Sequence, residues 1–80
     1  MDKYKIQIGD TLYQASTSYK KVFEWKILGI WLEEYLNGFK TIVRCSNGIW
    51  AQEFFASDVL DMYRTKEDAE NALAEKESRQ

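Results

Sequence analysis

The sequence predicts a small, mainly β domain, in which about five antiparallel strands form a barrel and one short C-terminal α-helix follows. Between residues 21 and 50, two apolar runs and the start of a third are separated by Asn37-Gly38 and by Asn47-Gly48. Asn-Gly between apolar runs is the strongest short-range signal for a β-hairpin. Near the C-terminus, Ala69, Ala72 and Leu73 follow helical spacing. The chain is therefore expected to be β-rich with a terminal helix.

The two Asn-Gly pairs predict a three-stranded meander over residues 22–36, 39–46 and 49–55. A two-residue turn at Asn37-Gly38 would place Leu36 opposite Phe39 and Leu32 opposite Val43. The inner face of these two strands is then expected to contain Leu28, Ile30, Leu32, Leu36, Phe39, Thr41, Val43 and Cys45.

The first strand of the meander changes face near Gly29. Phe23, Trp25 and Ile27 have the opposite parity to Ile30, so an extra residue is needed between the two sets. Glycine inside a strand often marks a bulge or bend. We expect a bent strand that serves two sides of the barrel, and expect Gly29→Val to destabilise by about 1–3 kcal/mol through backbone strain. The alternative is two shorter strands with a loop near Gly29.

The second Asn-Gly pair allows two arrangements. A two-residue loop at Asn47-Gly48 would place Cys45 opposite Trp50, and would turn Gln52 toward the interior, where its amide would need a hydrogen-bond partner. A four-residue loop is the competing arrangement.

The remaining segments complete a single domain over residues 1–80, with the barrel over about 3–60 and the helix over about 66–77. The alternation of Tyr4, Ile6 and Ile8 predicts a half-buried strand, which a turn at Gly9-Asp10 ends. A second β-prone run covers residues 11–14, and a polar surface loop covers 14–21. Val59 and Leu60 are expected to plug the barrel end, and Thr65 to cap the helix.

Composition excludes several classes of protein. The 80 residues contain one cysteine and no histidine, and their net charge is −2. One cysteine allows no internal disulfide, which fits a reducing cytoplasm. No early apolar segment is long enough for a signal peptide or a membrane span. We expect a cytoplasmic monomer with no membrane association.

Three stretches of the chain have a recognisable order, namely Gly9 to Tyr13, Val22 to Ile30, and the segment Tyr63-Arg64-Thr65-Lys66-Glu67-Asp68-Ala69-Glu70-Asn71-Ala72-Leu73. In this order they resemble small uncharacterised proteins of phages, prophages and Gram-positive bacteria. The resemblance implies an SH3-like barrel with a short terminal helix, and a phage or mobile-element setting. It implies no activity and no functional residues. This chain departs from the usual helix-opening motif at Asp68, where glutamate is usual.

No cofactor, metal site or catalytic group is expected. The carboxylates at 33–34 and at 58 and 61 match no metal-binding loop and are better explained as solvated charge. Cys45 has no histidine partner and is better explained as a small core residue. The dispersed glycines form no phosphate-binding loop. The chain is therefore predicted not to be an enzyme.

The outer face of the meander is the first candidate binding site. The predicted register turns a set of large side chains away from the core, namely Trp31, Tyr35, Ile42, Ile49 and Phe55, with Lys40 and Arg44 among them. Exposed aromatic residues beside basic ones are typical of recognition surfaces. The alternative is that the terminal helix covers this face with Tyr63 and Leu73.

Tyr13 and Tyr19 form a second candidate, because SH3-like barrels bind extended peptides in aromatic grooves between loops. The alternative is that Tyr13 is half-buried and Tyr19 is an ordinary loop residue. The function expected is a non-enzymatic protein-binding module, such as a phage accessory or inhibitory factor. The second function considered is a small nucleic-acid-binding barrel, whose basic stripe would comprise Lys3, Lys5, Lys20, Lys21, Lys40 and Arg44.

Overall fold

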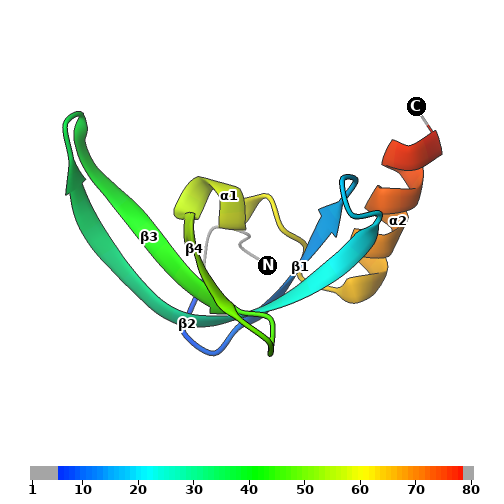
Figure 1. The fold of residues 1–80 in the computed structure, drawn as a ribbon, viewed down its shortest axis with the longest axis horizontal. Coiled ribbons are helices and arrows are strands. Elements are labelled where there is room, and N and C mark those ends of the chain that lie inside the picture. The colour runs from blue at the N-terminus through cyan, green and yellow to red at the C-terminus, as the bar shows by residue number, and fades with distance from the viewer. Residues whose placement is uncertain (1–5, 79–80) are drawn as a thin grey trace.

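Within residues 6–78, the chain forms four antiparallel strands and two helices (Figure 1). The computed structural model describes residues 6–78. The sheet order is β1-β2-β3-β4, and the strands are β1 (Thr11–Ser16), β2 (Lys21–Tyr35), β3 (Gly38–Ser46) and β4 (Ala51–Phe55). Two helices follow, α1 (Ala56–Leu60) and α2 (Lys66–Ser78). The predicted β-rich fold, the meander and the terminal helix are confirmed.

A bulge at Leu28 bends the long strand β2. Ile27 pairs with Cys45 and the next pair joins Gly29 to Arg44, which leaves Leu28 as the extra residue. The predicted bulge beside Gly29 is confirmed, but its expected backbone strain is not. The φ angle of Gly29 is not positive, and an added Cβ would meet only the Trp31 ring, at 3.5 Å. A side chain at Gly29 therefore meets ordinary contact distances.

The turn between β2 and β3 differs from the predicted type I′ turn. Tyr35 pairs with Gly38, so Leu36 and Asn37 are the two central residues. Only Gly38 has a positive φ, of +113°, whereas a type I′ turn needs two consecutive residues with positive φ. A turn followed by one left-handed glycine is the usual three-residue hairpin arrangement. The predicted register is consequently wrong by two positions.

A shift of two residues keeps every side chain on its predicted face, because side chains alternate with a period of two. Val43 pairs with Ile30 instead of Leu32. Trp31 pairs with Ile42, and both side chains lie on the other face of the sheet. Val43 is buried but Leu32 is 67% exposed, so their expected joint burial is wrong. The reason is visible in Figure 1, where the β2–β3 hairpin extends as an arm beyond the helices. The exposed large hydrophobic residues toward the tip of this arm are Leu32, Tyr35, Leu36 and Phe39.

The loop between β3 and β4 contains four residues, as the competing arrangement predicted. Ser46 pairs with Ala51, and Cys45 pairs with Gln52 instead of Trp50. The Asn47 side-chain oxygen accepts hydrogen bonds from the backbone N–H groups of residues 49 and 50, both at 2.9 Å. These two bonds favour the wider loop over a two-residue turn, because they stabilise backbone groups that the sheet does not pair.

The predicted N-terminal strand is not found over residues 6–10, and Tyr4 lies outside the described residues. Ile6 packs against the core, whereas Ile8 is 67% exposed. Gly9, at a φ of +97°, forms the predicted turn. Among residues 6–78 the sheet has four strands and is open, with β1 and β4 as its edges. Barrel closure and a fifth strand are therefore not shown by the described strands.

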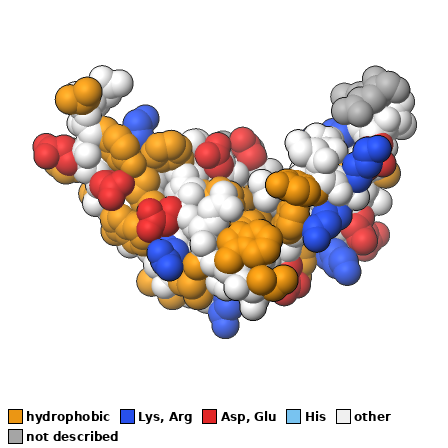
Figure 2. Space-filling view, viewed as in Figure 1, with side chains coloured by type: hydrophobic (Ala, Val, Ile, Leu, Met, Phe, Trp, Pro, Cys, Tyr) orange, Lys and Arg blue, Asp and Glu red, His pale blue; other side chains and the backbone are white. Residues whose placement is uncertain are grey.

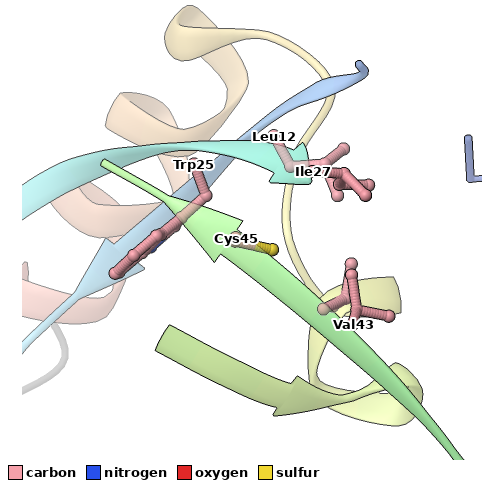
Figure 3. Packing of buried hydrophobic residues seen from close by; sticks show 6 residues of the cluster. Leu12, Trp25, Ile27, Val43 and Cys45 are labelled. Atoms are coloured by element: carbon pink, nitrogen blue, oxygen red, sulfur yellow. The ribbon is translucent and has the colours of Figure 1, made fainter. Parts of the chain in front are cut away.

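The core lies where the two halves of the bent sheet meet helix α1. Its buried residues come from β1, β2, β3 and α1, and Figure 3 shows the packing. They are Leu12, Trp25, Ile27, Val43, Cys45 and Val59. Val59 is 1% exposed and Leu60 is half-buried, so the expected burial is found at Val59, while the barrel end that the two residues were to plug is not shown. The segment that carries Val59 is a short helix, where the sequence indicated only a connection.

Helix α2 begins at the predicted cap. The Thr65 hydroxyl accepts a hydrogen bond from the Asp68 backbone N–H, at 3.1 Å. Ala69, one residue further on, is completely buried. The helix lies against β1 and β2, whereas α1 contacts β3 and β4.

Candidate protein-binding groove

An aromatic groove of about 390 Å³ lies between the β1–β2 hairpin and the β3–β4 loop. We call it the aromatic groove, and it is lined by Gln14, Ser16, Tyr19, Lys21, Phe23, Trp25, Trp50 and Gln52. Figure 2 shows hydrophobic side chains in the middle of the molecule, beside basic side chains near helix α2. A groove with several aromatic residues and a few polar groups is the usual form of a recognition site.

The rings in this groove contact one another and differ in exposure. The Tyr19 and Phe23 rings are edge-to-face at 5.6 Å, and the Phe23 and Trp25 rings lie 6.3 Å apart. Trp25 is 3% exposed, whereas Trp50 is 50% and Tyr19 is 73% exposed. The groove therefore has a floor anchored in the core and two accessible aromatic walls.

Two glutamines place amides in the groove. Gln14 accepts a hydrogen bond of 3.0 Å from the indole N–H of Trp25, which fixes that ring. The Gln52 side chain is exposed and has no hydrogen bond within residues 6–78. The sequence predicted that an inward Gln52 would need a hydrogen-bond partner. The structure places Gln52 at the surface of the groove, where its amide is accessible to a ligand.

The structure separates the two tyrosines of the second candidate site. Tyr19 lines the groove, and its backbone N–H donates to the Ser16 hydroxyl at 3.2 Å. Tyr13 instead pairs through its backbone with Tyr63, by two hydrogen bonds of 2.8 Å. Lys20, at a φ of +56°, closes the turn that carries Tyr19.

Part of the first candidate patch forms a small cluster of its own on the outer face of the sheet. We call it the outer cluster, and it contains Trp31, Tyr35, Ile42 and Phe55. Ile42 is only 4% exposed, and the Tyr35 and Phe55 rings meet at 5.9 Å. The Tyr35 hydroxyl donates to Glu33 at 2.8 Å, and this hydrogen bond raises the pKa of Tyr35. The outer cluster is therefore packed around a buried Ile42, while Tyr35 and Phe55 stay partly exposed, at 38% and 42%.

The other members of the first candidate patch lie around this cluster or away from it. Arg44 forms an ion pair with Glu53 at 3.3 Å, and Lys40 lies over the Phe55 ring at 5.7 Å. Ile49 is 84% exposed in the β3–β4 loop and is not part of the sheet face. The alternative from the sequence was that the terminal helix covers the outer face of the meander. Helix α2 instead makes its main sheet contacts with β1 and β2, away from Ile42 and Phe55 on β3 and β4.

The basic residues do not form one stripe. Lys21 lies over the Phe23 ring at 4.7 Å, beside the aromatic groove, whereas Arg44 and Lys40 lie at the outer face. Lys3 and Lys5 lie outside the described residues.

Within residues 6–78, neither grouped metal ligands nor an exposed thiol occurs. No group of three or more metal-ligating side chains occurs within residues 6–78. Cys45 is buried in the core, as predicted, and burial raises the pKa of its thiol to about 11. A thiol in that state is a poor nucleophile at neutral pH.

Sequence reasoning missed most of the aromatic groove. The alternation correctly predicts one face for Phe23 and Trp25, but the two-residue loop predicts Trp50 opposite the core residue Cys45, where the structure has Gln52. The available signal was the four-residue loop, because it removes Trp50 from the strand and exposes its ring. Gln14 had no local signal, since its partner Trp25 lies on another strand.

Searches against protein-family models, curated proteins and solved structures found no match to this chain. No helix within residues 6–78 has both the length and the apolar character needed to cross a membrane.

Proposed function

We propose that this chain is a non-enzymatic protein-binding module whose aromatic groove holds an extended segment of another protein. The observation that carries the proposal is the pair of accessible rings, Trp50 and Tyr19, around a free Gln52 amide. Tyrosine and tryptophan supply large contact areas at a small entropic cost, and amides bind peptide groups. The outer cluster is a weaker candidate because its residues already pack on one another.

The test is selection of peptides from a random display library with the full chain as bait. Trp50→Ala and Tyr19→Ala should each lower the affinity for the selected peptides by about tenfold or more, the usual scale of an interface hot spot. The matched control is Phe39→Ala, which removes an equally exposed aromatic ring on the arm. No enrichment, or equal loss with Phe39→Ala, would contradict the proposal.

The resemblance adds a biological setting to this proposal: a phage or prophage accessory or inhibitory factor that acts as a monomer in the cytoplasm. The small β-rich fold agrees with the fold that the resemblance implies. The SH3-like barrel stays a prediction, because the described sheet is open.

Nucleic-acid binding is the second candidate. Lys21 beside Tyr19 and Phe23 favours it, because single-stranded nucleic acids stack bases on such rings next to basic groups. The net charge of −2 and the dispersed basic residues favour a protein partner. Titration with single-stranded DNA and RNA at low salt decides the matter, and affinity weaker than about 10⁻⁴ M excludes it.

A further inference from the structure

The outer edge of β4 presents unpaired backbone groups. The Asn47 N–H donates to the Trp50 carbonyl at 3.1 Å. This bond determines which residues of β4 direct their backbone N–H and C=O groups toward β3. Because antiparallel strands alternate, the backbone groups of Gln52 and Phe54 point toward β3. The N–H groups of Ala51, Glu53 and Phe55 then point away from the sheet.

These three N–H groups have no hydrogen-bond partner within residues 6–78. The opposite edge of the sheet differs, because Tyr63 pairs with Tyr13 on β1. Unpaired edge strands bind extended segments of other chains through their main chains. Thus the outer edge of β1 is paired at Tyr13, whereas no segment within residues 6–78 pairs with the outer edge of β4.

Hollows adjoin both faces of β4. One of about 350 Å³ includes Tyr35 and Phe55 of the outer cluster, and one of about 400 Å³ extends toward Asp61. Both are lined by Gln52, Phe54 and Asp58, and the second shares Gln14 and Gln52 with the aromatic groove. Successive side chains of a strand point to opposite faces, so an added strand would fill both hollows.

The charge around this edge is mainly negative. Glu53 and Asp58 line the first hollow, and Asp58 and Asp61 line the second, where Lys76 is the basic lining residue. The Arg44 ion pair with Glu53 is half exposed and so screens that carboxylate only weakly.

From these observations we propose that a segment of the protein partner pairs with the free edge of β4 as an added strand and carries lysine or arginine toward Asp58 and Asp61. This inference rests on the proposed function, because it describes how the module would bind its partner. The added strand would extend along the edge to Trp50, where the aromatic groove begins.

The first experiment is amide hydrogen exchange on the free full chain. The N–H groups of Ala51, Glu53 and Phe55 should exchange at least about tenfold faster than those of Gln52 and Phe54. Equal protection would overturn the proposal, since another part of this chain or a second copy would then cover the edge. Dependence of that protection on protein concentration would identify the second copy.

The second experiment uses three synthetic peptides of about seven residues, the length of an ordinary strand. One alternates lysine with valine, one alternates glutamate with valine, and one is the lysine peptide with methylated backbone nitrogens. The lysine peptide should slow exchange at Ala51 and Glu53, and the other two should not. The proposal would be overturned if the glutamate peptide or the methylated peptide slowed exchange at Ala51 and Glu53 as much as the lysine peptide does.

Charge variants complete the test. The double variant Asp58→Asn, Asp61→Asn should bind the lysine peptide about tenfold more weakly than the natural chain does. Glu70→Gln, at an exposed position of α2, should leave that affinity unchanged. No difference between these variants would contradict the role of the two aspartates. If Trp50→Ala still abolishes binding of library-selected peptides, the protein-binding function stands and only the β4 edge is excluded.

Discussion

Trp25 and Gln14 are joined across β1 and β2 by a hydrogen bond of 3.0 Å from the indole N–H to the amide oxygen. Trp25 is 3% exposed, so its N–H has little access to water. Gln14→Leu should therefore lower the free energy of unfolding by about 1–3 kcal/mol, the cost of leaving a buried donor unpaired. Urea unfolding measures it. The control is Gln52→Leu, whose amide has no partner within residues 6–78, and equal losses would contradict this role of Gln14.

The glycines of β2 and β3 should respond differently to a side chain. Gly38 has a φ of +113°, which side chains oppose, so Gly38→Ala should destabilise by about 1–3 kcal/mol. Gly29→Ala should change stability by less than about 1 kcal/mol, because its φ is ordinary and its new Cβ would sit 3.5 Å from the Trp31 ring. Thermal unfolding of both variants tests the contrast. If Gly29→Ala lowered the stability more than this, the backbone strain expected from the sequence would be present at Gly29.

Cys45 should make the protein less stable in alkali. Burial raises the pKa of its thiol from 9.0 to about 11 in the folded chain. Between these values the unfolded chain binds fewer protons than the folded chain, so the free energy of unfolding falls as pH rises. Below about pH 9 this contribution is fully present. Urea unfolding at several pH values should show a steeper alkaline decline for the natural chain than for Cys45→Ala, and parallel declines would contradict it.

Thr65 should contribute measurably to α2. Thr65→Ala removes the acceptor of the Asp68 N–H and should cost about 0.5–2 kcal/mol, the usual value of a helix cap. Thr65→Ser retains the hydroxyl and should cost less. Circular dichroism during urea unfolding compares the two variants. Identical losses would show that the methyl group, and not the cap, carries the effect.

Local signals in the sequence predicted the strands and the helix of this fold well. Strand alternation and the Asn-Gly pairs placed β2 and β3 within one residue of their observed ends. Gly29 marked the bulge because the parity of apolar residues changes beside it. Thr65 marked the helix start through the chemistry of capping.

The errors arose where a local pattern has more than one geometric solution. Asn37-Gly38 fits both a two-residue turn and a turn with one left-handed glycine, and the choice moves the register by two. Burial failed at Leu32 because alternation gives the face but not how far the core extends. The aromatic groove depends on residues from two hairpins, whose proximity no local pattern contains.

The contacts between Tyr13 and Tyr63 and between Asp10 and Arg64 predict an order of folding. All strand pairs of the sheet join neighbours in sequence, whereas Asp10 and Arg64 are 54 positions apart. Closing so long a loop costs more entropy than forming a hairpin, so we expect the hairpins to form first and the contacts of Asp10 and Tyr13 with the 63–64 segment to form last. Asp10→Asn should thus accelerate unfolding while refolding keeps its rate, as stopped-flow kinetics would show. On this reasoning, the lifetime of the native state depends on the junction between the segment before β1 and the segment before α2.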